Sequence, residues 1–317
     1  LFDDVAPELP HAADRAAFPS VAAAHADLAN RVHAWLAERD PAATLWVCPT
    51  DYHGSAPFSR NLHELGERLH PAIELFYTGP RVCSPTISAD DADAFARAAR
   101  RPPLLWDNYP VNDLAMQPEL HLGPIRGRDP ALATATRGVL INPMLQAEAS
   151  KLPLRSWAAY LADPSGYDAE RAWEAAIGEL AGDESAWALC AFALCARSSW
   201  LEGSMAPRLE ALVAAVLDAR RDARFGNLQP AIRNLQAALT ELDEACYHIK
   251  NRMANLALRA ELLPWLELLE CQAELGLLAL RALAEPGSER GRLREQRATV
   301  ARHHKGIGAT AALLALA

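Results

Sequence analysis

The first half of the chain alternates short apolar runs with amphipathic stretches. The apolar runs, which read as buried strands, cover residues 1–5, 44–50, 72–79, 103–108 and 138–143. Apolar residues at helical spacing, such as Leu28, Val32 and Leu36, indicate helices at about 20–38, 59–70, 89–100 and 145–162. Continuous apolar strands separated by helices are typical of a parallel sheet in an α/β protein.

The second half has a different pattern. Beyond residue 166 no strand-like run remains, and Leu209, Val213 and Val216 follow the spacing of a helix with one buried face. The same spacing recurs at Ile232, Leu235, Leu239 and Leu242, and again at Leu262, Trp265, Leu266 and Leu269. The pattern therefore predicts two domains, an α/β domain over 1–165 and an α-helical bundle over 166–317.

Composition narrows the classes of partner. The 317 residues are 51% hydrophobic and 22% charged, with a formal net charge of −9. General nucleic-acid binders present a basic face to phosphate, so the acidic balance argues against that class. No uninterrupted apolar run approaches the roughly 18 residues of a membrane span. We therefore expect a globular protein that does not bind nucleic acid and has no membrane span.

Cysteine and histidine usage predicts no cofactor and no metal. The six cysteines are scattered without a CxxC pair, which excludes a small disulfide scaffold and leaves the compartment open between extracellular and cytoplasmic. The adjacent His303 and His304 lack two further spaced ligands for a metal ion. The segment 122–130 contains glycines but lacks the strand, lysine and hydroxyl of a phosphate-binding loop.

Polar residues follow the apolar runs where chemistry collects in parallel α/β sheets. Asp3 and Asp4 end the first run, and two close carboxyls suit a general acid beside an ionised carboxylate. Two solvated loop aspartates, or a helix cap, are the alternative. The WDNYPVND segment (106–113) combines carboxylates and amides with aromatic rings, which suits a sugar, although a loop rich in turn-forming residues reads the same way. Tyr52 ends the second run and could donate a hydroxyl or simply pack.

Six motifs in series resemble glycoside hydrolase family 84. They are LFDDV, CPTDY, YTGPRV, WDNYPVND, LHLGPIRGR and GVLINPMLQAEASKLPL. That family contains β-N-acetylglucosaminidases, among them protein O-GlcNAcases and enzymes called hyaluronidases. The resemblance implies a (β/α)8 TIM-type barrel, with strands 4–8 in residues 1–165, followed by a helical bundle domain.

The resemblance also implies a substrate-assisted, retaining mechanism without a cofactor, in which the substrate's 2-acetamido group is the nucleophile and an oxazoline is the intermediate. By resemblance, Asp3 orients the acetamido N–H and Asp4 is the general acid and then the base. The implied substrate-binding residues are Cys48, Tyr52, Thr78, Val82, Trp106, Asn108, Asp113 and Asn142. Tyr52 would bind the acetamido oxygen, Cys48, Thr78 and Trp106 its methyl group, and Asp113 and Asn142 the 4- and 6-hydroxyl edge. Asn108 would support the carboxylates, and Val82 would face the aglycone.

The resemblance leaves several points open. A glycine-rich strand end and a sugar-binding lysine of the family are expected upstream of Leu1, so we expect the 317-residue chain alone to be less stable and less active than an extended form. The expected partner is a β-N-acetylglucosaminide, on a glycan or a glycoprotein. A hyaluronan-degrading hexosaminidase and a non-catalytic glycan-binding module are the alternatives. The oligomeric state is not predicted.

Overall fold

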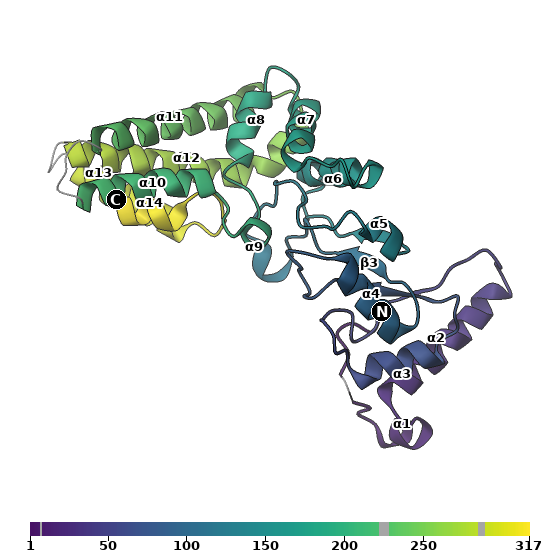
Figure 1. Cartoon of the computed structure of the whole chain (residues 1–317). Helices are drawn as coiled ribbons and strands as arrows, with labels where there is room; N and C mark the ends of the chain where they lie inside the picture. The colour runs from purple at the N-terminus through teal and green to yellow at the C-terminus, as the bar shows by residue number, and fades with distance from the viewer. Residues whose placement is uncertain (7, 222–227, 285–288) are drawn as a thin grey trace. The chain divides into compact units, whose positions relative to one another are not determined.

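A computed structural model describes residues 1–6, 8–221, 228–284 and 289–317 (Figure 1). Contacts between Cα atoms divide these residues into two compact units that interleave along the chain. Unit 1 comprises 1–109, 126–142 and 161–166, and unit 2 comprises 110–125, 143–160 and 167–317. A domain boundary at residue 165 stays a prediction, because the chain passes between the units several times before it.

The sheet of unit 1 is parallel, as the sequence pattern predicts. Its strands are β1 (Trp46–Val47), β2 (Glu74–Tyr77), β3 (Leu104–Asp107) and β4 (Gly138–Ile141), and they lie in the order β1-β2-β3-β4. The register pairs Trp46 with Glu74, Phe76 with Leu104, and Leu104 with Gly138. All the strands point the same way, so the residues that follow them lie along one edge of the sheet.

The prediction of a strand over residues 1–5 is wrong. Asp3 and Asp4 lie in a turn, and the described residues of this segment contain no strand. The backbone N–H of Phe2 nevertheless donates to the carbonyl of Cys48 at 2.8 Å, and the hydroxyl of Thr50 donates to the carbonyl of Phe2 at 3.0 Å. The segment thus lies beside the end of β1, but two aspartates that favour turns stop the pairing after one residue.

The helices of unit 1 begin at side-chain caps. They are α1 (Ala12–Ala17), α2 (Val21–Ala37), α3 (Arg60–Arg68), α4 (Ala89–Ala99) and α5 (Leu132–Ala135). Ser20 and Ser59 accept backbone N–H groups at the starts of α2 and α3, and Ser88 forms a capping box with Asp91 at α4. The expected helices at 20–38, 59–70 and 89–100 are confirmed to within two residues at each end.

A close backbone contact joins α3 and α4. A Cβ atom placed on Gly66 would lie 2.6 Å from the backbone of Ala99, so only glycine allows the two helices to approach this far. The apolar core of unit 1 lies between these helices and the sheet. Its members include Leu62, Leu65, Ile73, Leu75, Tyr77, Phe95 and Leu105.

The regular secondary structure described in unit 2 is helical, apart from an isolated bridge between Glu119 and Gly306. Its main helices are α6 (Ala147–Ala162), α7 (Ala169–Ala181), α8 (Ala186–Ala193), α10 (Pro207–Arg221), α11 (Leu228–Arg252), α12 (Leu256–Ala284) and α13 (Arg290–Arg302). The shorter ones are η1 (Leu114–Met116), α9 (Ser199–Glu202) and α14 (Thr310–Leu316). The helices that the periodicity of the second half predicts are confirmed as α10, α11 and α12.

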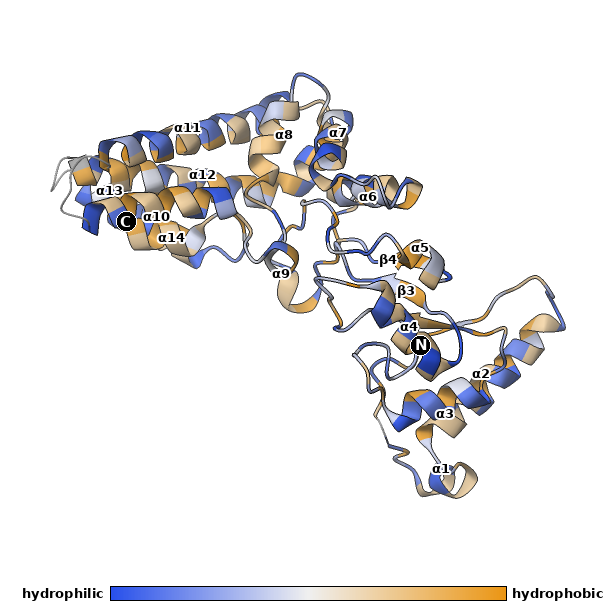
Figure 2. Ribbon diagram, viewed as in Figure 1, coloured by the Kyte–Doolittle hydropathy of each residue, from blue (hydrophilic) through white to orange (hydrophobic). Residues whose placement is uncertain are grey.

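The predicted faces of these helices form the core of unit 2. Leu235, Leu239 and Leu242 of α11 are buried, and so are Leu262 and Trp265 of α12. Hydrophilic and hydrophobic residues alternate along α11 in Figure 2, as one buried face requires. None of the described helices has the length and apolar character that crossing a membrane requires.

Candidate active site

The end of β1 brings four of the predicted site residues together. The thiol of Cys48 is buried, and burial, followed by the charge of Asp3, raises its pKa to about 12, with a smaller contribution from Asp4. Burial also raises the pKa of the Tyr52 hydroxyl, and the charges of Asp4 and Asp3 add to the rise. The hydrogen bonds of Phe2 with Cys48 and Thr50 place Asp3 and Asp4, which follow it, beside this strand end, and both pKa values respond to the charges of these carboxylates. The hydroxyl of Tyr52 therefore stays protonated and able to donate a hydrogen bond.

An apolar wall lies beside these carboxylates. Cys48, Phe76 and Leu104 form a buried cluster, against which Tyr52 and Trp106 pack. The rings of Phe76 and Trp106 lie 5.1 Å apart between centroids at 83°, an edge-to-face contact. The wall is formed by side chains from three neighbouring strand ends.

Asn108 joins the ends of β3 and β4. Its Oδ1 accepts a hydrogen bond from Trp106 Nε1 at 3.0 Å and another from Asn142 Nδ2 at 3.0 Å. Its Nδ2 donates to the carbonyl of Val82 at 2.8 Å. Four of the residues that the sequence singles out thus lie in one connected hydrogen-bond network, since consecutive parallel strands end at one edge.

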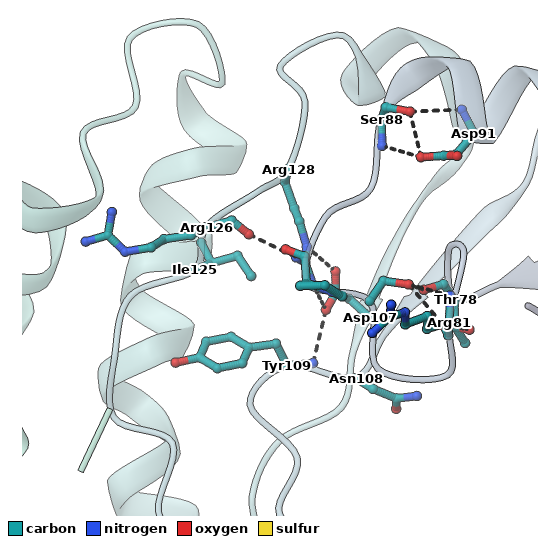
Figure 3. A network of polar contacts seen from close by, with 12 residues as sticks. Thr78, Arg81, Ser88, Asp91, Asp107, Asn108, Tyr109, Ile125, Arg126 and Arg128 are labelled. Carbon is teal, nitrogen blue, oxygen red and sulfur yellow. Dashed lines mark hydrogen bonds and ion pairs between the residues drawn. The ribbon is translucent and has the colours of Figure 1, made fainter. Parts of the chain in front are cut away.

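The hydroxyl of Thr78 serves the turn that follows β2. It donates to the carbonyl of Arg81 at 2.9 Å, while the carbonyl of Thr78 accepts from the hydroxyl of Ser84 at 2.9 Å (Figure 3). A Cβ on Gly79, which has φ +94°, would lie 2.5 Å from the Ser84 oxygen. The turn is therefore tightly packed, and it fixes both the side chain of Thr78 and the backbone that presents Val82.

An ion pair that sequence reasoning misses supports this edge. Asp107, the last residue of β3, accepts hydrogen bonds from Arg128 Nε at 2.7 Å and Nη2 at 2.8 Å (Figure 3). A backbone bridge between Ile87 and Arg128 places the arginine there. Asp107 stands in a run that is predicted to be a buried strand, and a buried charge requires a partner of opposite charge. This requirement is the signal that could have revealed the pair.

Asp113 belongs to unit 2. It precedes η1, and its carbonyl accepts the N–H of Met116 at 2.8 Å. Its role at the sugar stays a prediction. No group of three or more metal-ligating side chains lies within the described residues, where His303 and His304 stack at 5.3 Å between ring centroids.

Paired carboxylates beside the carboxyl edge of a parallel sheet, with amides and an aromatic wall at the same edge, suit a glycoside hydrolase. The model of the family described as NAGidase, beta-N-acetylglucosaminidase, matches residues 1–194. The chain belongs to this family, which is glycoside hydrolase family 84.

Known relatives agree with the family. The protein O-GlcNAcases of Rattus norvegicus and Mus musculus are 35% and 34% identical over 165 residues, which are 50% of this chain and 18% of each relative. A solved O-GlcNAc hydrolase mutant of Thermobaculum terrenum is 30% identical with a TM-score of 0.90, over 99% of this chain and 68% of its own. The structure of CpGH84B, at 22% identity and a TM-score of 0.79 over 91% of this chain and 54% of its own, shares the fold. The chain thus spans under a fifth of the curated relatives' length.

Proposed function

We propose that the chain carries the catalytic site of a retaining exo-β-N-acetylglucosaminidase that removes terminal β-linked N-acetylglucosamine, with protein-linked O-GlcNAc as the substrate class. The observation that carries the proposal is that the hydrogen bonds of Phe2 with Cys48 and Thr50 bring Asp3 and Asp4 to the strand end that also carries Tyr52. The names of the rodent and Thermobaculum relatives support the substrate class.

In the proposed reaction the substrate supplies its own nucleophile. The 2-acetamido oxygen attacks the anomeric carbon, the bond to the aglycone oxygen breaks, and Asp4 gives its proton to that oxygen. Asp3 accepts a hydrogen bond from the acetamido N–H and stabilises the positive charge of the oxazoline. Asp4 then removes a proton from water, which opens the oxazoline at the anomeric carbon and restores the acetamido group with net retention.

The apolar wall fits the acetyl group. In the proposal Tyr52 donates its hydroxyl to the acetamido oxygen, which the raised pKa of Tyr52 favours because the hydroxyl keeps its proton. Cys48 and Trp106 face the methyl group, and Thr78 completes that wall. The thiol of Cys48 remains neutral for the same reason, so no further charge competes with Asp3.

The hydrogen-bond network fits the rest of the sugar. Asn108, held by three hydrogen bonds, supports the carboxylate side, and Asn142 contacts the edge that carries the 4- and 6-hydroxyls. Asp113 accepts hydrogen bonds from the same hydroxyls. Val82, whose side chain is exposed, lies on the aglycone side.

We further propose that β1–β4 are strands of a (β/α)8 barrel. The parallel order of the strands, the helices between them and the contact of Phe2 with Cys48 support it. So does the TM-score of 0.90 to the Thermobaculum hydrolase. In such a barrel the carboxyl ends of all strands surround one site, which is where the proposed residues lie.

Release of nitrophenol from an aryl β-N-acetylglucosaminide tests the function. We expect turnover with retention, and tight inhibition by a thiazoline that mimics the oxazoline. Hydrolysis of internal hyaluronan linkages in preference to the aryl substrate would instead indicate a hyaluronan-degrading hexosaminidase. Binding of the sugar without turnover, in the 317-residue chain and in an extended form alike, would indicate a glycan-binding module.

A further inference from the structure

We propose that His121, together with Glu119, is a positioning residue for substrate binding: it holds the backbone of 110–113 so that Asp113 meets the 4- and 6-hydroxyls of the sugar. The inference rests on the proposed role of Asp113. His121 is part of the LHLGPIRGR motif, but neither the motif nor the proposed mechanism gives it a role, and all the contacts that carry the inference lie within unit 2.

The ring of His121 is aimed at the backbone that leads into Asp113. The residue is fully buried, and its Nδ1 lies 2.9 Å from the carbonyl oxygen of Val111 and 3.2 Å from that of Pro110. Both oxygens can only accept hydrogen bonds, so Nδ1 carries the proton. The histidine therefore ties two consecutive carbonyls to one donor.

Glu119 completes the arrangement at the other side of the ring. Its Oε2 lies 3.2 Å from Nε2 of His121. With Nδ1 as a donor, Nε2 and the Glu119 carboxyl group form a hydrogen bond when one of them also carries a proton, and that shared proton orients the imidazole. The ring also contacts Trp200 edge-to-face at 6.3 Å, which limits its rotation. The donor at Nδ1 is thus held in one direction.

Asn112 fixes the same segment immediately before Asp113. Its Oδ1 accepts the N–H of Leu145 at 2.9 Å, and its Nδ2 donates to Gln146 and to the carbonyl of Glu119 at 2.8 Å each. Glu119 therefore touches the segment through its backbone and, by way of His121, through its side chain. The two anchors belong to one polar cluster.

The backbone after Asp113 is strained, which is why it needs such anchors. Leu114 has φ +47° although it is not glycine, and its side chain is 83% exposed, so its own packing does not impose this conformation. A left-handed conformation at such a residue is unfavourable and persists only where the surrounding structure holds the backbone in place. His121 and Asn112 hold the residues just before Asp113, so loss of the Nδ1 donor should let Asp113 move.

The test compares substrate discrimination with stability. The full 317-residue chain and its variants are assayed with an aryl β-N-acetylglucosaminide and with its 4-deoxy and 6-deoxy analogues. Wild type should prefer the parent substrate, and Asp113→Ala should abolish the preference. We expect His121→Leu to reduce the preference in kcat/KM by roughly tenfold or more, mainly through KM, since a misplaced hydrogen-bond partner costs discrimination of that order.

Two variants separate positioning from folding. His121→Asn can place an amide N–H where Nδ1 stands and should restore most of the preference. Gln272→Leu removes a buried polar side chain of unit 2 that bonds the carbonyl of Ile307, and it should lower the melting temperature with the preference unchanged. Should His121→Leu not fold, Glu119→Leu replaces it in the comparison, with a smaller expected loss.

Equal losses of activity on the parent and deoxy substrates would overturn the inference, and so would a His121→Asn variant no better than His121→Leu. An unchanged preference in Glu119→Leu would also overturn it. An unchanged preference in Asp113→Ala would show that Asp113 does not bind these hydroxyls. That result would overturn the inference about His121 and leave the proposed hydrolase activity intact. A wild-type chain that turns over none of the substrates, alone or extended, would overturn the proposed function itself.

Discussion

Arg128 holds the carboxylate of Asp107 by two hydrogen bonds, and each side chain is only 1% exposed. The carboxylate also accepts the N–H of Tyr109 at 3.0 Å, and the guanidinium donates to the carbonyls of Pro85 and Arg126. The pair therefore connects the end of β3 with two loops of unit 1. The next residue after Asp107 is Asn108, so the position of the proposed site depends on this pair.

Loss of one partner of the buried pair should be costly. Arg128→Met leaves the carboxylate of Asp107 buried without its counter-charge, and we expect the free energy of unfolding to fall by about 3–5 kcal/mol. Urea denaturation followed by circular dichroism measures it. Arg155→Met is the matched control, because it breaks an exposed pair with Glu179 and should cost at most about 1 kcal/mol. Equal losses of unfolding free energy in the two variants would contradict the expectation that the buried pair contributes more to stability than the exposed one.

The two aspartates should differ in their dependence on the leaving group. Asp4→Ala should slow poor leaving groups far more than activated aryl ones, because the latter need little proton donation. Asp3→Ala should slow both, since Asp3 acts when the oxazoline forms. A series of aryl substrates with graded leaving-group pKa measures the slopes. Identical slopes for both variants would remove the assignment of roles.

The apolar wall should limit the length of the N-acyl group that the proposed site accepts. We expect turnover to fall along the series N-acetyl, N-propanoyl and N-butanoyl, because the longer chains outgrow the wall formed by Cys48, Thr78 and Trp106. Cys48→Ala should move the fall to a longer chain. Cys195→Ala, which removes a buried thiol from unit 2, should leave the order of substrates unchanged. A fall that is the same in all three proteins would argue against this wall as the acyl pocket.

The Cys48 thiol should resist modification in the folded protein. Its pKa is raised from 9.0 to about 12, so at pH 8 it carries almost no thiolate, the form that reacts with iodoacetamide. Peptide mapping should find Cys48 alkylated quickly in urea and slowly without it. Rapid alkylation in the folded state would contradict the burial.

The same shift sets the sign of a pH effect on stability. The unfolded thiol loses its proton near pH 9 and the folded one near pH 12, so the unfolded state binds fewer protons between these values. The contribution of Cys48 is therefore present below pH 9 and is lost as the pH rises. The unfolding free energy of Cys48→Ala should decline less steeply above pH 9 than that of wild type.

The strands of the sheet could be predicted because their apolar runs are continuous and bounded by polar residues. The run at 1–5 met the same criterion and failed, because Asp3 and Asp4 prefer a turn to a ladder of backbone hydrogen bonds. The helices α2 to α4 and α10 to α12 followed from periodicity alone. The interleaving of the two units could not be predicted, because a local sequence pattern carries no information on which distant segments pack together.

The site was predictable to the extent that strand ends meet at one edge. That rule brings together Cys48, Trp106, Asn108 and Asn142, and the motifs named them in advance. This rule does not predict the Asp107–Arg128 pair or the contacts of His121, because each joins a loop side chain to a partner that only the folded chain places beside it. The proposed roles of Asp113 and of the catalytic aspartates stay predictions.

The Oδ1 atom of Asn108 accepts hydrogen bonds from both Trp106 and Asn142, so the two halves of the proposed sugar site should be thermodynamically linked. A ligand that draws Asn142 toward a hydroxyl weakens the hydrogen bond that Asn142 donates to Asn108. A ligand that packs against the apolar wall constrains the indole of Trp106, which donates to the same oxygen of Asn108. Free energies for binding the two halves will therefore not add, and the coupling energy is what a double-mutant cycle between Trp106 and Asn142 reports. A fragment of the substrate is then an incomplete guide to the affinity of the whole.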